Sequence, residues 1–127
     1  MVNELIKFIR SYIELSDEEA NIVKDSSQIN SFKKNTLLLS EGDYSNEYYF
    51  IIKGCVRIFY IIEGEERTTE FYTENQSIIP ASFFNKKPSD YYISCIEDCV
   101  IAIGSEERDQ ALISKIPKLN ILINESN

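Results

Sequence analysis

The hydrophobic pattern of this chain changes at Thr36 from a helical period to an extended one. Before that point, residues 2–14 carry apolar side chains at positions 2, 5, 6, 9, 12 and 13, which is the spacing of an amphipathic helix. A Ser-Asp-Glu-Glu step at 16–19 is a capping-box pattern with acidic residues in the first turn, and it predicts a second helix over about 17–24. Residues 25–35 are polar and predict a loop, with room for a short strand around 29–32.

From Thr36 onward, short apolar runs alternate with turn signals such as Lys53-Gly54 and Glu63-Gly64. Short strands at this spacing predict an all-β sandwich or barrel. The run at 49–52 is apolar at every position, so that strand should be covered on both faces or lie at a dimer contact. The predicted strands lie near 36–40, 48–53, 55–62, 67–73, 77–80, 91–96 and 99–103.

The C-terminal part returns to a helical pattern. Ser105 is a good N-cap for a helix that should run to about Lys115 and stop before Pro117. We therefore predict one domain, with helices at about 2–24, a β-roll at about 28–104 and a helix at about 105–115. Beyond it, four apolar residues predict the first turns of another amphipathic helix. They need cover, which a homodimer would supply: Leu119, Ile121, Leu122 and Ile123.

Composition narrows the function classes. The 127 residues carry a net charge of −8, and the four arginines are scattered, so we expect no direct contact of this chain with nucleic acid. No apolar run is long enough to cross a bilayer, and the N-terminus lacks the features of a signal peptide. The odd number of cysteines, three, argues against a disulfide framework and for the reducing cytoplasm.

The candidate chemistry is sparse. The chain has no histidine, which removes the commonest general base and metal ligand, so we expect neither an enzyme nor a metal site. Cys55, Cys95 and Cys99 are expected to be buried, inert thiols, with thiol sensing as the alternative.

Two stretches carry a family resemblance: Leu-x-x-Glu-Gly-Asp at 38–43, and Phe-Ile-Ile-Lys-Gly-Cys-Val-Arg at 50–57. In this order, and with helices before and after, the chain over about 15–118 resembles the cyclic-nucleotide-binding domain of Crp/Fnr-type bacterial regulators. The resemblance implies a mainly β (α+β) fold: a double-stranded β-helix or jelly-roll β-roll with flanking N- and C-terminal helices. It also implies a cytoplasmic regulatory sensor domain without the helix-turn-helix part, because the chain ends near 116–119, where the family's long helix begins. Either the chain is an excised sensor domain or the natural protein is a short form, and the smooth polar ending at 124–127 favours the natural stop.

The family's ligand cassette corresponds here to residues 78–92. Its Gly-Glu step, which contacts the ribose, falls on Ile79 and Pro80, and its phosphate-binding Arg falls on Ser89 or Asp90. A proline offers neither a carboxylate nor an N–H donor. An aspartate near a phosphate costs on the order of several kcal/mol in a partly dry pocket, and losing the Arg–phosphate pair costs roughly 2–5 kcal/mol more. We therefore predict no cyclic nucleotide bound in the family's usual way, and no other cofactor.

The candidate site would be apolar and neutral to acidic, which suits a small uncharged ligand of unknown identity. Two alternatives remain: a β-roll that serves as a protein-interaction or dimerisation module without a ligand, and a cupin-type enzyme, which the absence of histidine disfavours. A pocket filled by Ile79, Phe83 or Phe84 would contradict the sensor interpretation. The candidate site residues are Ile58, Thr69, Phe71, Ile79, Pro80, Ala81, Ser82, Ser89, Asp90 and Tyr91.

Overall fold

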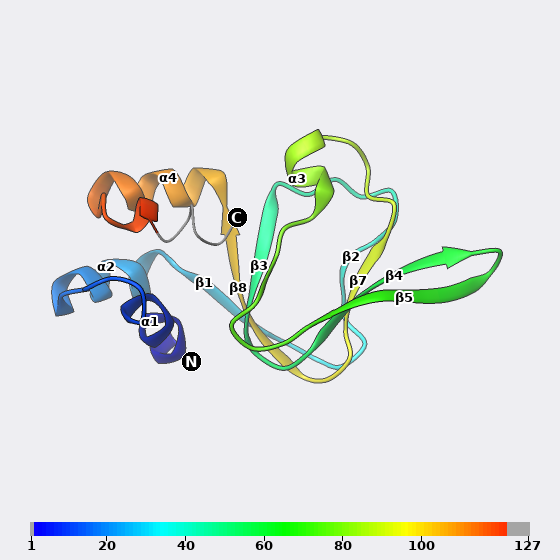
Figure 1. Ribbon diagram of the computed structural model, residues 1–127, viewed down its shortest axis with the longest axis horizontal. Helices are drawn as coiled ribbons and strands as arrows, with labels where there is room; N and C mark the ends of the chain where they lie inside the picture. The colour runs from blue at the N-terminus through cyan, green and yellow to red at the C-terminus, as the bar shows by residue number, and fades with distance from the viewer. Residues whose placement is uncertain (1, 122–127) are drawn as a thin grey trace.

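The computed structural model describes residues 2–121 and has the predicted mainly β architecture with helices at both ends (Figure 1). The predicted strands are present, and the optional strand around 29–32 is the first of them. The elements are α1 (Val2–Arg10), α2 (Asp17–Ser26), β1 (Gln28–Phe32), β2 (Leu37–Leu39), β3 (Glu47–Lys53), β4 (Val56–Ile62), β5 (Glu65–Tyr72), β6 (Ser77–Ile78), α3 (Ala81–Asn85), β7 (Tyr92–Cys95), β8 (Cys99–Ser105) and α4 (Glu106–Lys115).

The strands form two four-stranded antiparallel sheets with the orders β1-β8-β3-β6 and β2-β7-β4-β5. Side chains from both sheets meet in one core, where Ile51, Val56, Ile93 and Ile101 are fully buried. Because side chains alternate between the two faces of a strand, each sheet contributes every second residue to this core. The arrangement is the predicted β-roll.

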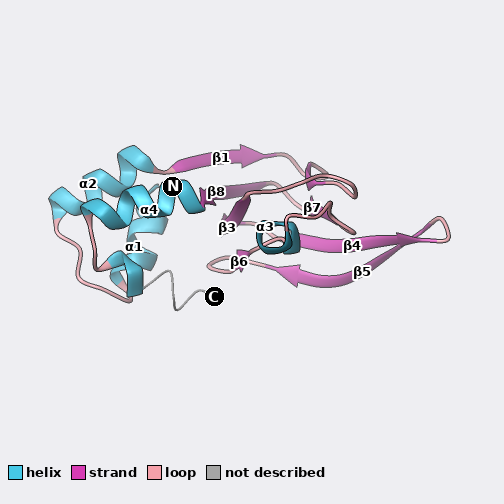
Figure 2. Cartoon of the chain, turned by 90° about the horizontal axis from the view of Figure 1, so that it is seen from above, coloured by secondary structure: helices cyan, strands magenta, loops and turns pink. Residues whose placement is uncertain are grey.

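Strand β3 is covered on both faces, as its continuous apolar run predicts. Tyr49 and Ile51 point into the roll core, whereas Phe50 and Ile52 point outward. The outward side chains are covered by α1, where the Phe8 and Phe50 rings lie 4.7 Å apart. The helical end of the molecule therefore packs on the outer face of the sheet that contains β3 and β8, away from the roll interior (Figure 2).

Helix α1 is shorter than predicted and ends at Arg10 instead of residue 14. The Ser11 N–H is shared between the carbonyls of Lys7 and Phe8, both at 3.1 Å, which tightens the last turn. The Arg10 guanidinium then binds the Leu15 carbonyl at 3.0 and 3.2 Å, so the chain turns back toward the start of α2.

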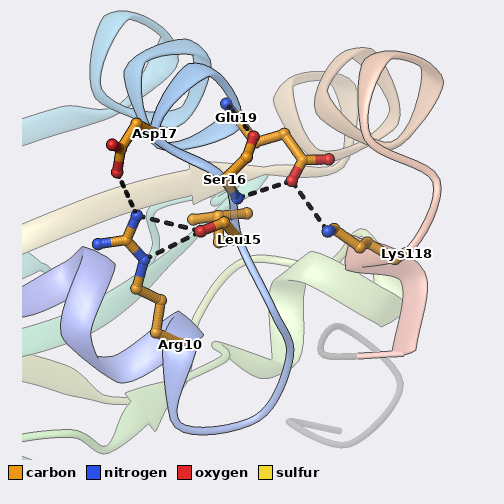
Figure 3. A network of polar contacts seen from close by, with 6 residues as sticks. All are labelled: Arg10, Leu15, Ser16, Asp17, Glu19 and Lys118. Atoms are coloured by element: carbon orange, nitrogen blue, oxygen red, sulfur yellow. Dashed lines mark hydrogen bonds and ion pairs between the residues drawn. The ribbon is translucent and has the colours of Figure 1, made fainter.

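The predicted capping box opens α2 (Figure 3). The Ser16 hydroxyl accepts the Glu19 N–H at 3.1 Å, and the Glu19 carboxylate accepts the Ser16 N–H at 2.9 Å. The Lys118 ammonium also lies 2.9 Å from this carboxylate. The Ser16 N–H and Lys118 together hold the pKa of Glu19 below its ordinary value. Two segments far apart in sequence are thus joined at one helix end.

The C-terminal segment supports the helical layer. Ser105 caps α4, and its hydroxyl accepts the Arg108 N–H at 3.2 Å, as predicted. Ile116 and Leu119 are buried among the helices, whereas Ile121 is 58% exposed. The prediction that tail residues need cover is therefore met within the chain for Leu119, while Leu122 and Ile123 lie outside the described residues.

The β4–β5 hairpin extends away from the body of the roll (Figure 1). Its turn residues Glu63 and Gly64 have φ of 54° and 82°, which is typical of a two-residue hairpin turn. Nearly all of β5 is exposed. Arg57 points outward and pairs with Glu66 at 2.6 Å. Among residues 2–121, none of the helices combines the length and the apolar character needed to span a membrane.

Candidate functional site

The segment that corresponds to the ligand cassette runs from β6 through α3 to β7. The predicted strand over 77–80 ends at Ile78, because Pro80 is the N-cap residue of the five-residue helix α3. Pro80 is fully buried and cannot donate a hydrogen bond. It therefore brings neither charge nor donor to the position that carries a carboxylate in the family pattern.

The two serines predicted to face a ligand are both buried and hold the cassette to the loop after β2. The Ser82 hydroxyl accepts the Ser45 N–H at 3.1 Å. Ser89 exchanges two backbone hydrogen bonds with that loop: the Gly42 N–H to its carbonyl and its own N–H to the Asp43 carbonyl, both at 2.8 Å. The Ser89 hydroxyl donates to the Tyr91 carbonyl at 2.8 Å. The serines thus use their hydrogen bonds within the protein.

Tyr91 closes the start of α3. Its hydroxyl accepts the Ala81 N–H at 2.9 Å, so the first N–H of the short helix already has a partner. Burial raises the pKa of Tyr91, and the nearby Glu70 and Asp90 charges act in the same direction. Asp90 itself is exposed. The N-terminal end of α3 is therefore occupied by a tyrosine hydroxyl that lies near two acidic side chains.

The predicted lining from the β4–β5 hairpin is only partly assembled. Ile58 is buried in the roll core, but Phe71 is 61% exposed and lies opposite Arg57, on the outer face. The reason is a register shift between Ile58 and Phe59, which leaves Thr69 as an extra residue on β5. A regular ladder counted from the hairpin turn would set Thr69 opposite Ile58. The bulge sets Glu70 there instead and turns Phe71 outward.

Three side chains that the sequence did not single out gather around Tyr91 and form with it a tyrosine cluster: Tyr60, Glu70 and Tyr72. Tyr60 meets Tyr91 edge to face, with ring centroids 5.7 Å apart. The Tyr72 hydroxyl donates to the Glu70 carboxylate, and burial together with this bond raises the pKa of Tyr72 to about 12. Glu70 faces this cluster only because of the bulge in β5, and the residue pattern does not reveal that bulge.

The positive charge of Lys86 is directed away from this tyrosine cluster. The Lys86 ammonium donates to the Phe83 carbonyl at 2.9 Å, back onto its own helix. Lys86 and Lys87 are both exposed. Within the described part of the chain, His, Cys, Asp and Glu side chains form no group of three or more that could hold a metal ion.

The aromatic residues of α3 do not fill the roll. Phe84 is 65% exposed, and Phe83 meets Tyr48 edge to face at 6.1 Å. Ile79 is half-buried. Tyr60 and Tyr91 instead pack against each other and against the roll core.

The cysteines lie around the start of β4, where Cys95 pairs with Val56, and are all free. Cys95 and Cys99 are buried as predicted, whereas Cys55 is half-buried. Burial raises the pKa of Cys95 to about 12 and also raises that of Cys55, which disfavours the reactive thiolate. Gly54, with a φ of 106°, lies against Cys99, and a Cβ there would come within 2.6 Å of the Cys99 Sγ. This part of the protein is packed as core.

Solved structures share this fold. A cyclic nucleotide-binding domain from Methylobacillus flagellatus is 20% identical with a TM-score of 0.74, over 93% of this chain and 68% of that one. The sensor domain of the transcriptional regulator DNR from Pseudomonas aeruginosa is 17% identical with a TM-score of 0.71, over 98% and 88%. The Thermus thermophilus catabolite activator protein is 21% identical with a TM-score of 0.66, over 90% of this chain, which spans only 56% of that protein.

The sequence itself carries the family assignment. Among curated proteins, none matches this sequence. The family described as cyclic nucleotide-binding domain, however, matches residues 29–115, which is most of the chain and includes both motif stretches and the cassette. This chain therefore belongs to the cyclic nucleotide-binding domain family.

Proposed function

We propose that this chain is the regulatory ligand-sensing domain of a Crp/Fnr-like transcriptional regulator, and that it does not bind cAMP or cGMP in the family's usual way. The observation that carries the proposal is the hydrogen bond from the Ala81 N–H to the Tyr91 hydroxyl, at 2.9 Å. An anion needs oriented N–H donors and a cation. Here the donor already has a partner, and the buried Pro80 adds none.

Electrostatics point the same way. Glu70 and Asp90 both contribute negative charge near Tyr91, while Lys86 is bonded to its own helix. A phosphate brought to this place would meet like charges in a partly desolvated setting, which costs free energy. The tyrosine cluster suits a small uncharged molecule that accepts hydrogen bonds from hydroxyl groups or donates hydrogen bonds to them.

The setting of the protein follows from the same features. Three free cysteines fit the reducing cytoplasm. The net charge of −8 and scattered arginines fit a chain that makes no direct nucleic-acid contact of its own. We expect regulation, not catalysis, and a homodimer as the working form.

Isothermal titration calorimetry with cAMP and cGMP tests the proposal. Wild-type protein should give no saturable heat, which corresponds to a Kd weaker than about 1 mM. The matched variant is Pro80→Glu combined with Asp90→Arg, which supplies the carboxylate and the cation of the family pattern and should gain affinity. Micromolar binding of either nucleotide to the wild type would contradict the proposal.

A second function, a protein-interaction module without a ligand, is favoured by the exposed apolar residues of the β4–β5 hairpin. Ile61, Ile62 and Phe71 are 43%, 53% and 61% exposed. Sedimentation of the wild type against Phe71→Ser tests this role, with Phe84→Ser as control because Phe84 is as exposed but lies on α3. A dimer that dissociates only in Phe71→Ser would support it, and a monomer at all concentrations would count against it.

A further inference from the structure

A cavity of about 140 Å³ lies outside the roll, among the helices that cover the sheet. Its floor is the outer face of β3 and β8, where Phe50 and Ala102 are buried. Its roof is formed by the helices, through Leu5 and Phe8 of α1, Val23 of α2 and residues of α4. The cavity is partly open to solvent and mostly apolar. It therefore lies where the helical layer meets the sheet, and Figure 2 shows these helices next to β3 and β8.

One wall of this cavity depends on a glycine. A Cβ on Gly104 would come within 2.2 to 2.6 Å of Tyr48 ring atoms, so the ring lies directly on the β8 backbone. Tyr48 and Gly104 are paired across the β3–β8 ladder. This close approach brings the Tyr48 hydroxyl to Asp109 of α4, at 2.7 and 2.8 Å from the two carboxylate oxygens. A side chain larger than hydrogen at 104 would displace that wall.

The Tyr48–Asp109 pair gives the cavity one polar end. A carboxylate has about four lone-pair directions, and among residues 2–121 the recorded side-chain donor to Asp109 is a single hydroxyl. Arg108 is directed elsewhere, to the Ile103 carbonyl at 3.3 Å and to Glu47 at 3.8 Å. Asp109 is half-buried, and it can therefore accept a further hydrogen bond from a molecule within the cavity.

Size sets the class of ligand. A cavity of about 150 Å³ is large enough to hold one benzene-sized molecule. Unfilled apolar space forfeits dispersion contacts, and an apolar group that displaces poorly ordered water from such a space gains affinity. We propose that this cavity is a second binding site, for a single-ring or similarly sized apolar molecule that bears one hydroxyl or amine donor directed at Asp109. The proposal is independent of what the roll itself binds.

Phenol and benzene are the probes, titrated into ¹⁵N-labelled protein with amide shifts as the readout. Phenol should bind saturably with a Kd on the order of 1 mM, and it should shift the amides of Ala102 and Gly104. Phenol should bind about tenfold more tightly than benzene because of the hydrogen bond to a carboxylate. Absence of saturable phenol binding, or equal binding of the two probes, would overturn the proposal.

Two pairs of variants locate the site. Ala102→Leu fills the cavity and should weaken phenol binding at least about tenfold, whereas Val100→Ile, on the same face of β8 but outside the cavity lining, should leave it unchanged. Asp109→Leu should abolish the advantage of phenol over benzene, and Glu107→Leu, exposed on the same helix, should keep it. Undiminished binding in Ala102→Leu would overturn the proposal. Should that variant not fold, shifts confined to cassette amides such as Ala81 and Tyr91 in the wild type would overturn it equally.

Discussion

Tyr48 shows at the residue scale what the sequence reveals and what it conceals. The pattern identifies Tyr48 as a residue of the strand near 48–53, but it does not identify the partner that a buried tyrosine hydroxyl usually has. In the structure the hydroxyl binds Asp109, 61 residues away, and burial raises the pKa of Tyr48. The missing information is the pairing of Tyr48 with Gly104, which only the ladder between β3 and β8 supplies.

We expect Gly104→Ala to destabilise the protein by about 1–3 kcal/mol, because the new methyl group forces the Tyr48 ring off β8. Urea denaturation measures this cost. In a Tyr48→Ala background the methyl group has no ring to displace, so the same substitution should cost much less. An equal cost in both backgrounds would show that the close approach to Tyr48 is not its cause.

Asp109 predicts a pH dependence of stability. Burial raises its pKa, with the Tyr48 hydroxyl opposing, so the folded protein holds this proton more tightly than the unfolded chain does. Stability therefore falls as pH rises from the ordinary carboxyl pKa of about 3.9 through the raised value. Denaturation midpoints measured across this range should show a smaller fall in Asp109→Asn than in the wild type. Parallel curves for the two proteins would contradict the assignment.

At the scale of elements, the flanking helices and most strands could be predicted because their periods are regular, whereas the five-residue helix α3 falls within the predicted β-roll. The capping box of α2 and the Ser105 cap of α4 could both be predicted from the sequence, since each depends on residues within one turn. The bulge in β5 was not, because a one-residue shift leaves no mark in the local pattern but turns every following side chain to the other face. This is why the sequence pattern places Phe71 at the site, where the structure has Glu70.

The α2 cap gives a prediction at this scale. Ser16→Ala removes the acceptor for the Glu19 N–H and should cost about 1 kcal/mol of unfolding free energy. Ser114→Ala is the matched control, because that hydroxyl donates to the Ala111 carbonyl within α4 and caps no free N–H. Chemical denaturation of both variants checks the difference. If the two substitutions cost the same, the capping box does not contribute to α2 stability.

At the scale of the whole molecule, the fold was predictable because strand spacing, turn residues and family motifs all indicate one β-roll. The candidate site was predictable only in part. The sequence shows which family residues are absent at Pro80 and Asp90, but the hydrogen bonds that hold the cassette depend on the folded backbone. Tyr91 with Ala81, and Ser89 with the loop at 42–43, could be found only once the roll was assembled.

The Ala81 amide reports most directly on whether this family member has a closed phosphate site. In ¹⁵N–¹H spectra of the wild type, its resonance should stay unchanged as cAMP is added to about 1 mM. Tyr91→Phe should shift it without any ligand, because the hydroxyl that accepts its N–H is gone. A saturable, cAMP-dependent shift of the Ala81 amide at micromolar concentrations in the wild type would contradict the account.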